Sequence, residues 1–380
     1  MELFGVDIGF GFTKVTNGRD MIVFKSVYGE ATDIQFRENL LDQGRQDEHL
    51  HIELEGNAFF VGELAERQST VRYFTLDQNQ LMGNFVKILT VAALSKLSTG
   101  KEQIKLVTGL PIKFYSSYRE QLVHQLTGRH SVISINPDGS REERVVDIAQ
   151  VKVIPQPFGS MYNLMLNDHG EGGDRRFLTE KIGVVDIGFR TADYTVSNRT
   201  KYLERASRTY DNGISQTFAT LANKLQESSG VNIELFRLFE AVKKGSIKIR
   251  GKQYDLAKTL DRIHGQLASE IANEVNQLWV DEWDIDNIVI SGGGGAVLAP
   301  HLHGLIDGNI LPMNPDEDAR FNNAKGYLKY SRYLWGREAA PQASVPPKSA
   351  TPAQLAAAMR AAAQPAAAPS PEPDNEQPAD

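Results

Sequence analysis

The sequence lacks cysteine, long apolar runs and a large excess of either charge, and each absence narrows what the protein can be. Zero cysteines exclude disulfides, thiolate catalysis and cysteine-ligated zinc. No stretch approaches the roughly 18 apolar residues of a transmembrane helix. The N-terminus, Met1–Phe4, leads directly into an expected strand without a basic segment followed by an apolar one, so we expect no secretory signal. Together these features favour a cytoplasmic protein that does not associate with membranes.

Basic residues are scattered along the chain, and the formal net charge is −7. Proteins that bind nucleic acid regardless of sequence need a clustered basic surface that neutralises phosphates. The longest basic cluster, around Lys243 and Lys244, is short and is typical of a solvated helix end. We therefore expect no direct nucleic-acid binding, and a role in DNA handling would require a DNA-binding adaptor protein.

The length and the C-terminal composition indicate how the chain is divided. A chain of 380 residues exceeds the usual size of a single core, which predicts two domains. From residue 338 the composition changes: 15 alanines and 9 prolines lie among the last 42 residues, and aromatic residues are absent. Such a segment buries too little apolar surface to offset its chain entropy. We expect residues 338–380 to be a disordered tail, with at most a marginal helix over 353–363.

One short pattern occurs twice. Phe4–Lys14 and Gly183–Asp193 both contain Asp-Ile-Gly-Phe, with Asp7 and Asp186 lying 179 positions apart (186 − 7). Each copy predicts a strand, a tight glycine turn and a second strand. Two copies of one hairpin, about half the globular chain apart, predict two similar domains that face a shared cleft.

The remaining periodicity predicts an α/β protein. Helices are expected over 80–97, 116–126, 160–166, 212–225, 233–243, 260–278 and 324–335, further strands over 104–108, 131–136, 145–153 and 285–290, and hairpins over 51–61 and 248–254.

The two hairpins carry residue types that suit a phosphate chain. Glycine turns at strand ends expose backbone N–H groups that phosphates can approach closely, as at Gly9 and Gly11. Lys14 can reach a β- or γ-phosphate as a point charge. Asp7 and Asp186 end equivalent strands, where two carboxylates can hold Mg²⁺ through its waters. This arrangement suits nucleotide hydrolysis.

A run of four glycines, Gly292–Gly295, follows the expected buried strand Ile288–Ile290. It allows close backbone approach to a flat adenine or ribose, or else forms a tight strand-to-helix turn. Other phosphate-binding motifs do not fit. The chain has no Gly-x-x-x-x-Gly-Lys-Ser/Thr loop, and Gly9-Phe10-Gly11 lacks the third glycine of a dinucleotide fingerprint and precedes a strand instead of a helix.

The order of these motifs resembles the actin/Hsp70/sugar-kinase superfamily: an Asp-x-Gly hairpin, a strand-to-helix junction at Pro155-Gln156, a second Asp-x-Gly hairpin and a glycine run. Within it, the strings Val6–Lys14, Phe60–Glu63 and Val107–Pro111 resemble bacterial plasmid-segregation actins of the ParM/StbA type. Asn323–Tyr327 resembles that family's closing helix. The resemblance extends over about residues 1–335.

The resemblance implies an actin-like fold of two ribonuclease H-like domains with a nucleotide cleft. The expected parts are domain I (1–152), domain II (153–322), a closing helix that returns to domain I (323–337) and the tail (338–380). It also implies ATP and Mg²⁺ as ligands, ATP hydrolysis, self-association into filaments and, through an adaptor, segregation of plasmid or other DNA.

The resemblance also assigns site residues. Asp7, Gly9, Gly11, Thr13 and Lys14 correspond to the first phosphate loop, Asp186, Gly188 and Thr191 to the second, and Gly292, Gly293 and Gly294 to the adenosine loop. Asn212, Gly213, Lys224 and Glu227 correspond to the ribose and adenine side. Gln156 takes the place of the residue that orients the attacking water, with Asp7 and Asp186 as the metal-holding carboxylates. A neutral Gln positions water but is a poor base, so the hydrolysis rate stays open.

Two other functions remain alternatives. A small-molecule kinase on the same fold needs an Asp base near the acceptor hydroxyl, and no motif marks one. An ATP-binding scaffold that neither polymerises nor turns over would keep the same motifs.

Overall fold

A computed structural model describes residues 1–32, 49–312, 314 and 316–339. Met1–Arg337 form one compact unit. The predicted tail and its marginal helix lie outside the described residues, except for residues 338–339, which end the last described helix. No helix of the described part combines the length and the apolar character that crossing a bilayer requires.

The first lobe, defined here as residues 1–155, is built on a ten-stranded sheet in the order β3-β2-β1-β8-β10-β9-β5-β6-β4-β7. Its strands are β1 (Glu2–Ile8), β2 (Phe12–Thr16), β3 (Met21–Lys25), β4 (Tyr28–Glu30), β5 (Leu50–Leu54), β6 (Asn57–Val61), β7 (Arg72–Tyr73), β8 (Ile104–Leu110), β9 (Gly128–Ile135) and β10 (Arg141–Pro155). β1, β8 and β10 run parallel, and the sequence-predicted hairpins β1–β2 and β5–β6 are confirmed.

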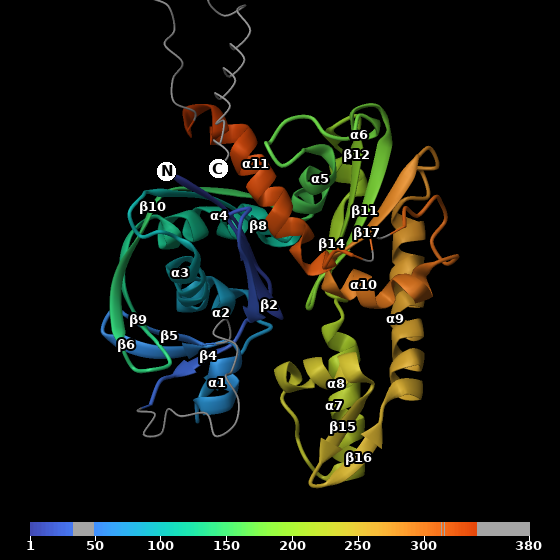
Figure 1. The fold of residues 1–380 in the computed structure, drawn as a ribbon. Coiled ribbons are helices and arrows are strands. Elements are labelled where there is room, and N and C mark those ends of the chain that lie inside the picture. Colours follow the sequence, from blue (N-terminus) through green and yellow to red (C-terminus); the bar gives the residue numbers. More distant parts are fainter. Residues whose placement is uncertain (33–48, 313, 315, 340–380) are drawn as a thin grey trace, which may run out of the picture. The chain divides into compact units, whose positions relative to one another are not determined.

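Helices α1 (Glu63–Gln68), α2 (Gln78–Gln80), α3 (Val86–Leu97) and α4 (Ile112–Leu126) complete the first lobe. α3 is buried on nearly every side and lies inside the curve of the sheet, where it forms the centre of the core (Figure 1).

The second lobe, defined as residues 176–312, has a five-stranded sheet of β11 (Lys181–Ile187), β12 (Ala192–Asn198), β13 (Lys201–Tyr202), β14 (Arg208–Tyr210) and β17 (Asn287–Ser291). Its other elements are α6 (Arg176–Thr179), η3 (Glu204–Ala206), α7 (Ser215–Ser229), η4 (Leu235–Leu238), α8 (Phe239–Lys244), the hairpin β15 (Ser246–Ile249) and β16 (Lys252–Asp255), α9 (Ala257–Leu278) and α10 (Gly292–Leu302). The β11–β12 hairpin repeats β1–β2, as the sequence predicted, and β17 lies parallel to β11 as β8 does to β1.

Two helices connect the lobes: α5 (Pro157–Met165) and α11 (Asn322–Ala339), the latter preceded by η5 (Ala319–Phe321). They touch through their backbones, because a Cβ built on Gly326 would lie 1.7 Å from the Gly159 carbonyl oxygen. The Pro155-Gln156 junction and the closing helix therefore meet at one point between the lobes (Figure 1).

Several boundaries differ from the sequence predictions. The expected helix over 80–97 is interrupted by a π-helical turn, η2 (Leu81–Phe85), because Gly83 has a non-helical ψ of −148°. The helix expected from Ser116 begins at Ile112, directly after Pro111, and α5 begins at Pro157 with proline in its first turn. The helix expected over 233–243 begins as the 3₁₀ turn η4.

The largest difference concerns Gly292–Gly295, which form the first turn of α10 and not a loop. Gly292 has φ +80°, and its Cβ would lie 2.4 Å from the Ile187 carbonyl oxygen. Only glycine lets this helix begin directly against the end of β11. The close approach that the sequence predicted therefore exists, and its partner within the protein is the second hairpin.

Candidate functional site

A cavity of ≈ 720 Å³ lies where the two hairpins face each other. Of the predicted site residues, it is lined by Gly9, Gly11, Lys14, Gln156, Gly188, Thr191, Gly293 and Gly294. Asp7, Thr13 and Asp186 are buried at the base of the turns, with at most 3% of each residue exposed. Predicted residues that lie up to 285 positions apart in the sequence (294 − 9) thus line one cavity.

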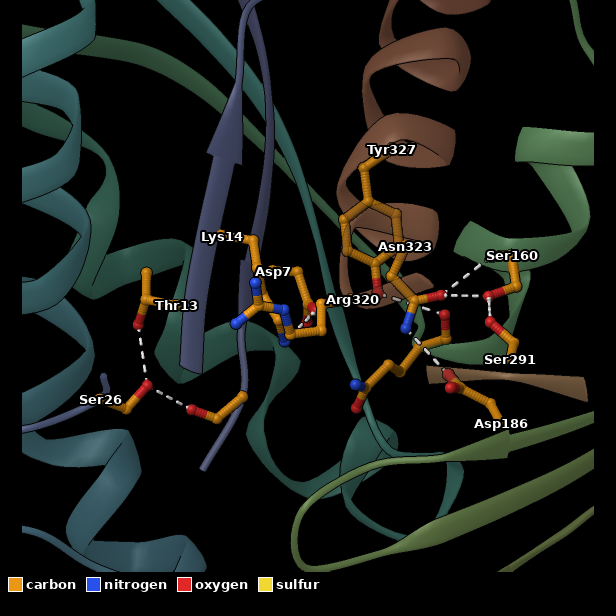
Figure 2. A network of polar contacts seen from close by, with 12 residues as sticks. Asp7, Thr13, Lys14, Ser26, Ser160, Asp186, Ser291, Arg320, Asn323 and Tyr327 are labelled. Atoms are coloured by element: carbon orange, nitrogen blue, oxygen red, sulfur yellow. Dashed lines mark hydrogen bonds and ion pairs between the residues drawn. The ribbon is translucent and has the colours of Figure 1, made fainter. Parts of the chain in front are cut away.

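The first turn is supported from below. Lys14 pairs with Asp7 across the β1–β2 register, and its Nζ donates to Asp7 Oδ2 at 2.8 Å. Thr13 Oγ1 shares a hydrogen bond with Ser26 Oγ at 3.0 Å, and Ser26 Oγ donates to the Gly9 carbonyl at 2.6 Å (Figure 2). Thr13 therefore holds the turn in shape and does not line the cavity.

The second turn presents a carboxylate that is held by α11. Asn323 Nδ2 donates to Asp186 Oδ2 at 2.8 Å. Burial raises the pKa of Asp186 to about 6; the Asn323 hydrogen bond and the Lys14 charge lower it, and the charge of Asp7 raises it further. Asp7 and Asp186 are thus close enough to interact electrostatically although they belong to different lobes.

A buried polar network connects this carboxylate to the interlobe helices (Figure 2). Asn323 Oδ1 accepts hydrogen bonds from the Ser160 backbone N–H at 2.9 Å and from Ser160 Oγ at 2.8 Å. The two hydroxyls of Ser160 and Ser291 lie 2.5 Å apart, and Asn322 Nδ2 donates to Ser291 Oγ at 3.2 Å. Sequence reasoning marked Asn323 only as part of the closing helix and did not assign a site role to it, to Ser160, Ser291 or Asn322.

Gln156 lies at the junction between β10 and α5. Its backbone N–H donates to the Leu110 carbonyl at 2.7 Å, and its carbonyl accepts from the Tyr327 hydroxyl at 3.2 Å. The backbone is therefore held by both the first lobe and α11, while the residue lines the cavity.

Four predicted residues are not among those that line the cavity. Asn212 is buried, and its Nδ2 donates to the Tyr194 hydroxyl at 3.2 Å and to Glu274. The Gly213 N–H donates to the Arg190 carbonyl at 2.8 Å. Lys224 is half-buried and Glu227 exposed on α7.

The assignment of these four residues to the ribose and adenine side stays a prediction. α7 packs its apolar side into the core of the second lobe, and Lys224 and Glu227 are not among the residues that line the cavity.

Residues that were not predicted also line the cavity. They come from α8, α9, the β11–β12 turn and the segment before α11, and include Phe189, Glu240, Lys243, His264, Asp318 and Arg320. Phe12 of the first lobe meets Phe239 of the second with ring centroids 4.5 Å apart, and Phe189 lies 5.1 Å from Phe239. Lys243 belongs to the basic pair that sequence reasoning took for a solvated helix end. No sequence signal marked the aromatic residues, since their spacing is that of ordinary core positions.

The carboxylate pattern suits one hydrated cation. Among the residues that the structure describes, no group of three or more His, Asp or Glu side chains could hold a metal. Two buried carboxylates at equivalent strand ends fit Mg²⁺, which keeps several of its waters and takes few protein ligands. Zinc would need four closely spaced ligands that this site does not supply.

A third buried carboxylate bridges the lobes. Asp193 on β12 accepts the backbone N–H of Ile112, the first residue of α4, at 3.2 Å, and also the Thr209 hydroxyl. Burial raises its pKa to about 7, the Thr209 and Ile112 hydrogen bonds oppose this, and the charge of Asp186 adds to it.

The variant Asp193→Asn is expected to unfold with a free energy that depends less on pH. The Asp193 pKa rises from 3.8 in the unfolded chain to about 7, so the folded state binds the extra proton and the wild type loses stability as pH rises from about 4 to 7. Urea unfolding measures the free energy of unfolding of the variant minus that of the wild type. This difference should be about 2 kcal/mol larger at pH 8 than at pH 5. Asp211→Asn is the control: Asp211 is an exposed carboxylate of the second lobe that pairs with Lys113 of the first lobe, next to Ile112. An equal difference at both pH values would contradict the prediction.

In the comparison with known proteins, each of the two lobes matches a family of actin-like proteins. Residues 5–159 match the family described as actin like proteins N terminal domain, and residues 184–304 match archaeal actin homologue MreB-like, C-terminal. A 15-stranded ParM filament structure from Clostridium botulinum is similar, with 24% identity, TM-score 0.74, and coverage of 87% of this chain and 99% of that one. A pCBH ParM non-polymerisable quadruple mutant has 25% identity, TM-score 0.72 and coverage of 89% and 99%.

A third similar structure is Ta0583, an archaeal actin homolog, in complex with ADP, with 19% identity, TM-score 0.70, and coverage of 89% of this chain and 100% of that one. The comparison with curated protein sequences gives no match. The similarity thus extends over both lobes.

Proposed function

Because the chain belongs to the actin-like proteins and has their fold, we propose that it binds ATP with Mg²⁺ in the cavity between its lobes, hydrolyses it, and self-associates into filaments. The observation that carries the proposal is the pair of Asp-Ile-Gly hairpins facing one cavity of ≈ 720 Å³. A volume of this size is typical of sites for nucleotide-sized ligands.

The phosphates would lie between the two turns. The N–H groups of Gly9 and Gly188 already donate to the Phe12 and Thr191 carbonyls, so the donors would be the backbone N–H groups of 10–11 and 189–191. Lys14 would supply positive charge. Lys14 is held by Asp7 at 2.8 Å and is largely buried, so its position is set before a ligand arrives. The second turn offers Thr191 and the guanidinium of Arg190, which also lines the cavity, so both turns bring a positive charge to the phosphates.

Mg²⁺, when bound, would neutralise charge on the phosphates and orient them. Asp7 and Asp186 would hold its waters, with Asn323 fixing the Asp186 carboxylate. Gln156 would hold the attacking water through its amide. Because an amide does not take up a proton at neutral pH, its role is positioning, and turnover should be slow relative to a site with a carboxylate base.

The adenosine would lie against Gly293 and Gly294 at the start of α10, with α8 opposite. Glu240 and Lys243 line this part and replace Lys224 and Glu227 in the proposal. A glycine backbone without side chains and a long side chain offer a flat ring both a surface and hydrogen-bond partners.

Filament formation and a role in moving plasmid or other DNA are supported by the fold and by the similarity to the ParM filament structure. With a net charge of −7 the chain would reach DNA through a basic adaptor protein. In this role the protein would act in the cytoplasm.

The test is sedimentation and electron microscopy of the purified protein with ATP·Mg²⁺, with ADP and without nucleotide, with phosphate release followed in parallel. ATP-dependent filaments and phosphate release support the proposal. A protein that binds ATP but neither assembles nor releases phosphate would be the scaffold alternative. ATP consumption that depends on an added acceptor, without filaments, would identify a kinase. Either result would overturn the proposed function.

A further inference from the structure

The most exposed large aromatic residue among those described is Trp283, at 88%, and Val280 beside it is 70% exposed. Both lie in the turn between α9 and β17, next to the exposed Asp281 and Asp284. We call Val280, Asp281, Trp283 and Asp284 the tryptophan pole. An isolated exposed apolar residue needs no explanation, but a tryptophan and a valine side by side among carboxylates have the composition of a protein-binding surface.

This turn is rigid. Trp279 is buried, and its Nε1 donates to the Ala206 carbonyl at 2.9 Å. Glu282 is buried between Lys181, at 2.6 Å, and Arg205. The Lys181 backbone N–H also donates to Asp286 Oδ2 at 2.7 Å. Trp283 is thus held in solvent by a braced backbone, so little conformational entropy is lost when a partner covers it.

A surface of opposite charge lies at the other end of α9. Lys244, Lys248, Arg250 and Lys252 are exposed on α8 and the β15–β16 hairpin, and we call them the lysine pole. Within the described part of the chain, Lys248 and Arg250 form no ion pair, and Lys244 reaches only Glu240, at 4.0 Å. Lys252 lies over the ring of Tyr254, so aromatic surface is present here too.

The two poles cannot meet within one molecule. β16 ends at Asp255 and α9 begins at Ala257, while α9 ends at Leu278 just before the tryptophan pole. A straight helix of 22 residues is about 33 Å long and keeps them apart (Figure 1).

We propose that the tryptophan pole of one copy binds the lysine pole of the next. This rests on the self-association proposed above and names its surfaces. Asp284 is already paired with Lys181, so the carboxylate of Asp281 would be the one that faces Lys248 and Lys252. The indole of Trp283 would receive a lysine or arginine over its face. Because the two surfaces differ, the contact is head-to-tail, and repeating it extends an open chain of subunits.

The test uses two variants that each damage one pole: Trp283→Ser and Lys248→Glu/Lys252→Glu. Neither should assemble with ATP·Mg²⁺, while both keep wild-type thermal unfolding and ATP binding. At about one tenth of the wild-type concentration, each should slow wild-type elongation, because each adds to a filament end through its intact pole and then blocks that end. Tyr333→Ser, which removes another aromatic that is 61% exposed, is the control and should assemble normally.

Asp281→Lys provides a second variant of the tryptophan pole and should behave as Trp283→Ser does. Folded variants that assemble, or that leave wild-type elongation unchanged at that ratio, would overturn the inference while the proposed function stands. A wild-type protein that stays monomeric with ATP would overturn both.

Discussion

Replacing Asp186 by alanine is expected to reduce Mg²⁺-dependent ATP hydrolysis by at least about 100-fold. The carboxylate lies at the end of β11, it is 3% exposed, and Asn323 holds it at 2.8 Å. Its loss would remove one of two groups proposed to hold the waters of Mg²⁺. Steady-state phosphate release at saturating ATP and several Mg²⁺ concentrations measures the effect.

The alanine variant also leaves the Asn323 amide without its acceptor in a buried network, so Asp186→Asn is the matched control. Its amide oxygen can accept the same hydrogen bond, but it carries no charge. Because burial already raises the pKa of Asp186 to about 6, the uncharged side chain should leave thermal stability at neutral pH unchanged or higher. Both variants should lose turnover. Near-normal turnover in Asp186→Asn would refute the role of the charge.

Gln156→Ala separates water positioning from ligand binding. It should slow phosphate release by about 10- to 100-fold and leave the ATP dissociation constant nearly unchanged, because Gln156 lines the cavity and its hydrogen bonds to the described residues are made by its backbone. An equal loss of binding would assign Gln156 to ground-state contacts with the nucleotide.

Gly326→Ala is expected to destabilise the protein by on the order of 3 kcal/mol or more. Its Cβ would lie 1.7 Å from the Gly159 carbonyl oxygen and 2.9 Å from the Asn163 nitrogen, both backbone atoms of α5. The two helices would have to separate, and Asn323, one turn earlier on α11, would move with them away from Asp186.

Gly336→Ala on the same helix is the control, since the nearest atom to its Cβ is 3.9 Å away. There the substitution should stabilise by about 0.5–1 kcal/mol, because alanine favours the helix over glycine. Urea unfolding monitored by circular dichroism compares the pair. A Gly326→Ala variant as stable as Gly336→Ala would show that α5 and α11 do not touch in solution.

Local chemistry along the chain was enough to predict both hairpins and the glycines and Lys14 that line the cavity at their turns. Asp-Ile-Gly-Phe marks a turn wherever it occurs, because strand pattern and glycine conformation act over a few neighbouring residues. The repeat itself, read from Asp7 and Asp186, implied two related lobes around one cleft. Lys14 followed from its place beside the first turn, whereas Gln156 was assigned only through the family resemblance.

Only the tertiary structure decided which helix reaches the cavity. Lys224 and Lys243 are both lysines on amphipathic helices, and nothing local distinguishes them; the packing of α7 and α8 on the second lobe directs Lys243 to the cavity and Lys224 away from it. The Asn323–Asp186 hydrogen bond joins residues 137 apart, and the Gly326–Gly159 contact joins two helices that are far apart in sequence. Such contacts depend on how complete elements pack, which residue types and short-range periodicity do not encode.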